Sequence, residues 1–404
     1  MTNIIFFAII LIFLKKWEPM FSAWAWRIFM KKILGAAFAA LLLSSNLFAY
    51  NPPAGGQNVL RLTEPQLLTG AHSAAGGGLF GVTPASIVNN PALTAWEQRI
   101  TLDVAGTLFI NSNTDEPYGG HSLGEGFQGA LLIPSRWCVS TLLFQGVWTQ
   151  AFDMPIGDSL NFTGGLAKDI TDQVSVGMNA NFGLLYGDWV DSDWTANLAF
   201  GAYYNHGDLA FMRNVRFGVA MTNLGKVYAK SGKTSGIKTA KAYRDWVDDG
   251  KNESGYSNED STPWPGICTI RTGFAATMLR TDIMDLGVSL DLSYPFFQDF
   301  VADLGLQLQF WDSIKVSSSW EFDAQEFANG SKNIMPSVGV SFKFIFNSAQ
   351  GSYLSNKGWD QSDMTVSGAW KQMYKNVNAV SAGAVLNLGL ADTKAPEITM
   401  WGDQ

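Results

Sequence analysis

Residues 174 to 186 read VSVGMNANFGLLY, and apolar side chains alternate with small or polar ones along almost the whole stretch. A period of two is typical of a β-strand with one apolar and one polar face. The polar face carries Ser, Gly and Asn, whereas the outer faces of a soluble sandwich need charged residues. This composition favours a transmembrane barrel whose apolar side faces lipid and whose inner face lines a wet interior.

The same alternation recurs after residue 100 in fourteen separate stretches. They start near Ile100, Gly126, Cys138, Ser159, Gln173, Asp193, Asn214, Gly266, Ile283, Asp299, Ser313, Asn333, Asp363 and Val377. Most are close in length to the about 9 to 11 residues that a tilted barrel strand needs to cross a bilayer. An even number of strands leaves both chain ends on one side of the membrane. We therefore predict an all-β fold, a transmembrane antiparallel β-barrel of about 14 strands.

The lengths of the connections support this topology. The second, fourth, eighth and tenth connections are tight turns, such as Ser135 to Trp137, whereas the first, third, fifth, seventh and eleventh are longer and polar. The seventh runs from about Gly225 to Pro265. Outer-membrane barrels have short periplasmic turns and long external loops. The thirteenth connection, around Asn376, is short for the external side, so the limits of the last three strands stay open.

The N-terminal region predicts export. From Met30 the chain has two lysines, a short apolar run from Ile33 to Leu43, and the small residue Ala49 at the expected cleavage point. These are the parts of a secretory signal peptide, and the run is too short for a membrane anchor, which needs about 20 residues. We predict a signal peptide at residues 30–49. Residues 1–29 then form an upstream extension, with Met30 as the working start; the alternative is one long export leader.

Composition narrows the function further. The formal net charge is −8 at pH 7, and no concentrated basic face is available for phosphate binding, so a nucleic-acid partner is not expected. After the leader no run of 18 apolar residues occurs, which excludes helical membrane spans but permits barrel strands. Cys138 and Cys268 could pair in an oxidising periplasm or remain as two small buried thiols.

Residues 50–99 have a different character. The stretch from Gly70 to Gly81 is rich in Gly and Ala, and no sustained period of two is present. Glycine favours turns and permits close backbone approach. Because a segment of this size is too small to fold alone, we predict that residues 50–99 form a hatch that plugs the lumen. The barrel then covers residues 100–390, and residues 391–404 form a periplasmic tail.

The hatch region also carries a motif. After the Gly-rich stretch the chain reads VTPASIV at residues 82–88, and Asn90, Pro91 and Ala92 follow just before the first strand. Together these residues resemble the FadL-like outer-membrane transporters of hydrophobic compounds, and a little-characterised spirochaete branch in particular. The resemblance implies a fourteen-stranded barrel, a hatch that carries the Asn-Pro-Ala triplet, uptake of fatty acids or other apolar molecules, and a lateral exit beside a kinked strand. An Asn-Pro pair can also simply make a turn.

Two features depart from that family. Many barrels end on an aromatic residue, whereas this chain continues past its last strand through Asp392 to Gln404. The family's external ligand groove is not recognisable by motif, so the substrate does not carry over. A related branch is a partner of protein-secretion machinery, and an outer-membrane scaffold for protein partners is therefore the alternative function.

Catalytic and metal-binding chemistry is not expected. A hydrolase on a barrel needs a His base beside a Ser nucleophile, and His72, His121 and His206 fall in the hatch, an outer loop and a periplasmic turn. The segment from Asp245 to Tyr256 resembles a calcium loop only superficially, because Tyr256 stands where the bidentate Glu should be. We predict no catalytic residue, metal ligand or cofactor.

Polar residues on the inner face are the remaining candidates for ligand contact. If the alternation holds, seven of them line the lumen: Arg216, Asp291, Gln307, Gln309, Lys315, Glu321 and Lys343. These mixed charges can instead pair with one another and with the hatch, which is the simpler interpretation. Arg in place of lumen-facing Ser289 should be tolerated better than Arg in place of lipid-facing Leu290.

The sequence thus predicts an outer-membrane channel for passive uptake of hydrophobic small molecules, such as long-chain fatty acids, in contact with outer-membrane lipid. An apolar tunnel past the hatch would favour this channel. A fully packed lumen would favour the scaffold.

Overall fold

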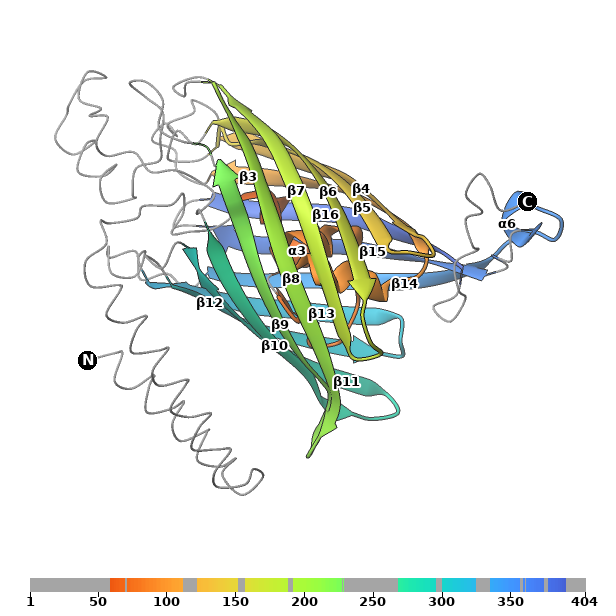
Figure 1. The fold of residues 1–404 in the computed structure, drawn as a ribbon. Helices are drawn as coiled ribbons and strands as arrows, with labels where there is room; N and C mark the ends of the chain where they lie inside the picture. Colours follow the sequence, from red (N-terminus) through yellow and green to blue (C-terminus); the bar gives the residue numbers. More distant parts are fainter. Residues whose placement is uncertain are drawn as a thin grey trace, which may run out of the picture. The chain divides into compact units, whose positions relative to one another are not determined.

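Strands of alternating side chains close into one antiparallel barrel in the computed structural model (Figure 1). The structure describes residues 59–69, 71–111, 122–151, 157–187, 192–226, 228, 268–295, 300–324, 335–356, 359, 361–373 and 377–389. The predicted signal peptide, upstream extension and C-terminal tail lie outside these residues, as do His121 and the segment from Asp245 to Tyr256.

Within the described residues the barrel has fourteen strands. They are β3 (Ile100–Asn111), β4 (Leu123–Pro134), β5 (Val139–Trp148), β6 (Asp158–Asp169), β7 (Val174–Tyr186), β8 (Asp193–Leu209), β9 (Met212–Lys226), β10 (Thr269–Arg280), β11 (Met284–Tyr294), β12 (Val301–Phe310), β13 (Ile314–Asp323), β14 (Met335–Asn347), β15 (Gln361–Met373) and β16 (Val377–Leu388). Strands that follow one another in sequence pair antiparallel, and β16 pairs with β3 to close the sheet. The predicted fourteen-stranded antiparallel barrel is confirmed.

Side chains alternate between the two faces of the wall. On β7 the side chains of Val176 and Phe182 are exposed, whereas Ser175 and Asn179 are buried. Val104 on β3, which is 65% exposed, belongs to the same apolar outer surface. A closed barrel leaves no unpaired sheet edge in lipid, and its apolar face is the one that lipid covers. The chain is therefore a transmembrane barrel of the kind found in bacterial outer membranes.

The connections between strands define a turn end and a loop end of the barrel. At the turn end most connections are short, as at residues 135–138 and 210–211. The exception is residues 348–360, a longer connection that carries α6 (Tyr353–Asn356). At the loop end most connections are longer, although β15 and β16 are joined by residues 374–376 alone. The chain enters β3 and leaves β16 at the turn end, as an even strand number requires.

Register shifts interrupt the hydrogen-bond ladders in one part of the wall. They lie between β8 and β9, between β9 and β10, and between β10 and β11. The ladders that join β4, β5 and β6 run without a shift. Extra residues bend a strand and increase its twist, so the irregular part of this wall is β8 to β11.

One sequence prediction is wrong in detail. β8 continues to Leu209 although its pairing with β9 has three register shifts, so His206 lies on a strand and not in a turn. The His206 ring is exposed, and its Nδ1 lies 3.2 Å from the Tyr204 hydroxyl.

Cys138 and Cys268 are free and half-buried. They cannot pair, because Cys138 precedes β5 at the turn end and Cys268 precedes β10 at the loop end.

The described residues between 59 and 99, called the hatch from here on, lie inside the barrel (Figure 1, orange). They form η3 (Val59–Thr63), α3 (Pro65–Leu68), β1 (His72–Ser73), β2 (Gly76–Gly77), η4 (Pro84–Val88) and η5 (Pro91–Trp96). Proline starts several of these helices, where its missing N–H is not needed. The Glu64 side chain caps α3 by accepting a hydrogen bond from Leu67 N at 2.8 Å. Among the described residues, no helix is long and apolar enough to cross a bilayer.

Candidate functional site

Asn90, Pro91 and Ala92 join the hatch to the barrel wall. The Asn90 side chain is fully buried, and its Oδ1 accepts a hydrogen bond from Ala92 N at 3.0 Å, which caps η5. Its Nδ2 donates to the carbonyl oxygen of Ala202 on β8 at 3.0 Å. The Ala92 carbonyl oxygen accepts from Ser175 Oγ on β7 at 2.9 Å. The triplet thus both shapes the hatch and connects it to two strands.

Glycines on the inner face let the hatch approach the wall backbone to backbone. Gly177 on β7 lies against Pro91, and Gly218 on β9 and Gly273 on β10 lie against Ala74. An added Cβ at any of these glycines would overlap hatch backbone. Glycine is needed here for close approach, which corrects the interpretation of this face as the lining of a wet interior. At this height the lumen is filled by protein.

Polar wall side chains bind the hatch backbone from many directions. They donate to hatch carbonyl oxygens as follows: Thr107 Oγ1 to Leu62 (2.7 Å), Gln145 Nε2 to Leu60 (2.7 Å), Asn179 Nδ2 to Ile87 (3.1 Å), Ser289 Oγ to Ala71 (3.0 Å) and Ser337 Oγ to Thr69 (2.5 Å). These donors lie on β3, β5, β7, β11 and β14, which are distributed around the closed sheet. Since one such bond contributes about 1 kcal/mol net, the hatch is held by many modest contacts.

Arg216 on β9, one of the predicted lumen residues, binds the Gly-rich turn of the hatch. Its side chain is fully buried, and its Nη2 donates to the carbonyl oxygens of Gly77 and Gly78, the latter at 3.0 Å. The guanidinium carbon lies 4.7 Å from the centre of the Phe80 ring, which is within cation–π range. Arg216 is therefore engaged by the hatch on two sides.

Asp291 on β11, also predicted, lies between the hatch and an arginine that sequence reasoning missed. Its Oδ1 accepts from Ala74 N at 2.7 Å, and its Oδ2 forms an ion pair with Arg271 on β10. Arg271 Nη1 in turn donates to Asn89 Oδ1 of the hatch at 2.8 Å. Alternation could have identified Arg271, because it shares its face of β10 with Gly273. Nothing in the pattern of β10 indicates its partner.

Gln307 on β12 and Glu321 on β13 are also engaged. Gln307 Oε1 accepts from Leu79 N of the hatch at 2.8 Å. Glu321 Oε2 lies 2.9 Å from Lys371 Nζ on β15, and both side chains are buried. Buried charges are tolerated when they are paired. At these positions the contacts favour the simpler interpretation, in which inner-face charges pair with one another and with the hatch.

The other three predicted residues, Gln309, Lys315 and Lys343, line a cavity on the turn side of the hatch. This turn-side cavity has a volume of about 530 Å³. Hatch residues 80–83 form one wall, and the turn ends of β12 to β16 form the opposite wall. Charged, amide and apolar side chains all contribute to its lining.

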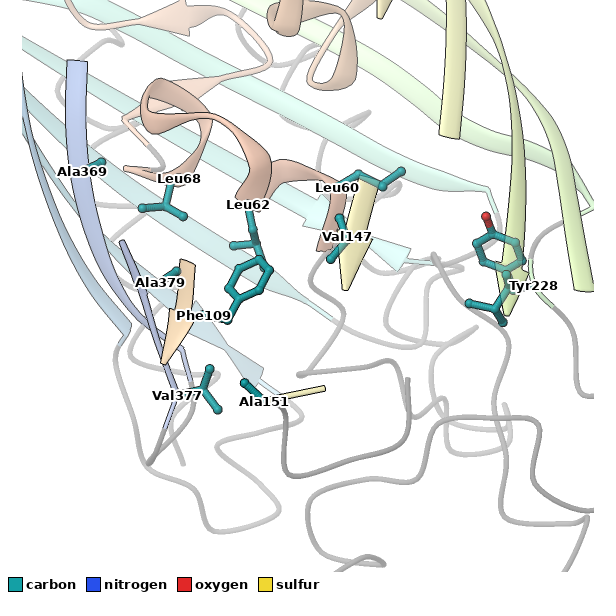
Figure 2. Packing of buried hydrophobic residues seen from close by; sticks show 11 residues of the cluster. Leu60, Leu62, Leu68, Phe109, Val147, Ala151, Tyr228, Ala369, Val377 and Ala379 are labelled. Carbon is teal, nitrogen blue, oxygen red and sulfur yellow. The ribbon is translucent and has the colours of Figure 1, made fainter. Parts of the chain in front are cut away.

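Buried apolar side chains of the hatch and the wall pack together on the loop side of the hatch (Figure 2). One cluster of buried residues forms there: Leu60, Leu62, Leu68, Phe109, Val147, Ala151, Leu185, Tyr228, Ala369, Val377 and Ala379. Leu60, Leu62 and Leu68 belong to the hatch, and the other members lie on the wall or shortly after a strand. Buried polar side chains lie among them: Asn111 Nδ2 donates to Ala151 O at 2.8 Å, and the Tyr228 hydroxyl donates to Asn161 Oδ1 at 3.2 Å. The loop side of the hatch therefore combines an apolar cluster with inward-facing polar residues.

Two ionisable hatch residues have shifted pKa values. Burial raises the pKa of Glu64 to about 7, although a backbone hydrogen bond from Leu67 acts in the opposite direction. Burial lowers the pKa of His72 to about 3, and the nearby cations Lys315 and Arg216 lower it further. In the docked hatch His72 is therefore neutral at neutral pH. Within the described ranges, no group of His, Cys, Asp and Glu side chains is arranged to hold a metal ion.

Comparison with known proteins finds no matching family model and no matching curated protein. Among solved structures, the chain is similar to the toluene transporter TodX of Pseudomonas putida, at 8% identity and a TM-score of 0.45, covering 85% of this chain and 100% of that one. It is also similar to the monoaromatic hydrocarbon channel CymD, at 11% identity and a TM-score of 0.43, covering 81% and 98%. A third similarity is to the outer membrane protein Omp33 of Acinetobacter baumannii, at 9% identity and a TM-score of 0.36, covering 73% and 100%. The substrate of one channel cannot be assigned to another at such low sequence identity. The function of this chain therefore has to be inferred from the geometry of its lumen.

Proposed function

We propose that the chain is an outer-membrane channel for passive uptake of hydrophobic small molecules, such as long-chain fatty acids, with the hatch as its gate. The observation that carries this proposal is the apolar cluster on the loop side, where Phe109 and Val147 of the wall pack with Leu60 and Leu62 of the hatch, so that a shift of the hatch would uncover apolar surface inside the barrel. Moving apolar surface from water onto such a lining is favourable by about 25 cal/mol per Å². A polar solute would lose its hydration there without finding partners.

The way the hatch is held supports a gated channel over an open pore. Wall side chains bond to hatch carbonyl oxygens, and water can replace each such bond at a net cost of about 1 kcal/mol. The hatch can therefore shift locally while the barrel stays closed, because the ladder bonds run between strands. The resemblance of residues 70 to 95 to FadL-like transporters supports the same role.

An outer-membrane scaffold for a secretion or surface-assembly system is the second candidate. The observation that favours it is the number of strands that bond the hatch, since a permanent plug requires such anchoring and a gate does not. Protein partners would then bind outside the lumen, and no apolar molecule would enter it.

Photolabelling distinguishes the two candidates. A fatty acid that carries a photoreactive diazirine is added to the barrel in lipid nanodiscs, and the labelled residues are mapped by mass spectrometry. Leu108 on β3 faces lipid and is the internal control, whereas the adjacent Phe109 is buried in the lumen. The channel predicts label on both residues. Label on Leu108 with none on Phe109, in folded protein, would contradict the channel and favour the scaffold.

A further inference from the structure

Two lysines face the turn-side cavity with little neutralisation from neighbouring acids. Among the described residues, Lys315 Nζ has neither a hydrogen bond nor an ion pair. Lys343 Nζ lies 3.8 Å from Asp363 Oδ2, which is at the outer limit of an ion pair. An ammonium group in a confined space favours an anionic partner, so this cavity is suited to a negatively charged ligand.

The carboxylates in the cavity lining are already engaged. Arg99 binds Glu97 Oε1 through Nε at 2.8 Å and Asp363 through Nη1. Asn387 Nδ2 donates to the second oxygen of Asp363 at 2.8 Å. Asp312 is exposed in the turn that joins β12 and β13, where it accepts a hydrogen bond from Gln309. The lysines are therefore the cations of the cavity that are available to a ligand.

His72 provides a second sign of positive potential in the same place. It lines the cavity together with Lys315. After burial, the causes that lower its pKa are the positive charges of Lys315, Arg216 and Arg61. A cationic ligand would meet the same repulsion that adds to the effect of burial on the pKa of His72.

The rest of the lining defines the body of the ligand. Phe80 and Val82 of the hatch and Ile314 and Val385 of the wall contribute apolar surface. A volume of about 530 Å³ exceeds that of an inorganic anion and falls in the range of about 300 to 1,000 Å³ that is usual for small organic ligands. An inorganic anion would leave this apolar surface unused, and a neutral apolar molecule would leave the lysines without a partner.

We propose that the turn-side cavity is a binding site for a small organic oxyanion, a carboxylate or phosphate ester on an apolar body. The oxyanion lies between Lys315 and Lys343, and the body packs against Phe80, Val82 and Ile314. A fatty acid is itself a carboxylate on an apolar body, so the cavity also fits the proposed cargo, but the site is tested by affinity and not by flux. If the uptake experiments fail, the proposed anion site is not contradicted. If anion binding fails, the proposed uptake is not contradicted.

The test is calorimetric titration of the purified full-length barrel in detergent. The probes are benzoate, phenyl phosphate, benzyl alcohol, benzylammonium and inorganic phosphate. We expect one or both organic anions to bind, with the tighter of the two identifying the oxyanion, and the other three probes to bind at least tenfold more weakly. Benzyl alcohol or inorganic phosphate binding as tightly as the better organic anion would overturn the proposal.

Lysine variants locate the site. Lys315→Met should weaken binding of the organic anion at least tenfold, and Lys343→Met should weaken it by a smaller factor. Lys168→Met is the matched control, because Lys168 is an exposed lysine at the turn end of β6 whose Nζ donates to Trp137 O away from the cavity. Lys315→Gln is measured as a second variant in case Met disturbs the packing. Unchanged affinity in folded Lys315→Met and Lys315→Gln proteins would contradict the assignment.

Discussion

Arg216 illustrates how single side chains hold the hatch. It is fully buried and donates to two hatch carbonyl oxygens through Nη2. Among the described residues, its Nε and Nη1 have no hydrogen-bond partner, and burying such donors is unfavourable. The contacts with Gly77, Gly78 and Phe80 have to offset that loss. This guanidinium group therefore anchors the Gly-rich turn together with Asp291 and Gln307, which accept from Ala74 N and Leu79 N.

Arg216→Met should loosen the hatch and leave the barrel folded. Gly77 and Gly78 lose a charged donor, at about 1.5 to 3 kcal/mol for hydrogen bonds of this kind. Leakage of a hydrophilic dye from proteoliposomes should rise severalfold, with unchanged mobility of the unheated protein in gels. Arg213→Met is the control, because Arg213 is exposed on the same strand. Equal leakage in the two variants would contradict the anchoring role.

Two hatch residues predict opposing pH dependences of hatch docking. The pKa of Glu64 is raised from 4.5 to about 7, so its contribution to docking is present below pH 4.5 and is lost as the pH rises toward 7. The pKa of His72 is lowered from 6.5 to about 3, so its contribution is present above pH 6.5 and is lost as the pH falls toward 3. Between pH 4.5 and 6.5 the two slopes oppose each other, and dye leakage through the wild-type barrel should vary little.

Single substitutions separate these slopes. In Glu64→Gln the contribution of Glu64 is removed and that of His72 remains, so leakage should increase as the pH falls from 6.5 to 4.5. In His72→Gln the contribution of His72 is removed and that of Glu64 remains, so leakage should increase as the pH rises over the same range. Each slope is at most about 1.4 kcal/mol per pH unit. Matching pH profiles in the two variants would show that these residues do not titrate with docking.

At the scale of the strands, the period of two predicts the fourteen strands of the barrel wall. It does not predict which residues the inner face contacts. Parity along β11 correctly places Leu290 outward and Ser289 inward. Ser289 is nevertheless buried, and its Oγ donates to Ala71 O of the hatch. Arg at Ser289 would displace the hatch, so its effect combines loss of hatch docking with the effect of the inner face and does not compare the two faces cleanly. Alternation along a strand predicts whether a side chain points inward or outward. It does not predict how close an inward side chain lies to the hatch.

A better pair of variants tests the two faces of the wall. Leu290→Arg should destabilise the barrel by about 2 to 4 kcal/mol, because it places a charge near the middle of the bilayer. Gln309 is half-exposed at the turn-side cavity, so Gln309→Arg should cost less. Urea unfolding in lipid vesicles, followed by gel mobility of the unheated protein, gives both midpoints. Indistinguishable midpoints would mean that the faces of β11 or β12 are assigned wrongly.

The contacts between hatch and wall mark the limit of sequence reasoning. Asn90, Pro91 and Ala92 can be found because they form a short contiguous motif. Arg271 and its partner Asn89 are 182 residues apart, and a local period carries no information about such a pair. The longer turn-end connection with α6 also has no signal in the alternation, because it lies between strands.

At the scale of the whole barrel, the hatch lies between an apolar cluster on its loop side and a cavity with two lysines on its turn side. Phe109 and Val147 belong to the apolar cluster, and Lys315 and Lys343 face the cavity beyond the hatch. An apolar molecule that enters from the loop side has to pass the hatch to reach the turn side. Movement of the hatch is therefore the step on which the proposed uptake depends.

The most direct test compares the intact protein with a variant that lacks residues 50–95. Each is reconstituted in vesicles with lipopolysaccharide in the outer leaflet, which slows spontaneous entry of apolar molecules, and protein-free vesicles give the baseline. The intact barrel should pass a labelled fatty acid above the baseline and exclude a hydrophilic dye. The truncated barrel should insert, because its strands pair with one another, and should admit the dye. Normal insertion with both fluxes equal to those of the intact protein would show that the hatch gates nothing and would contradict the channel.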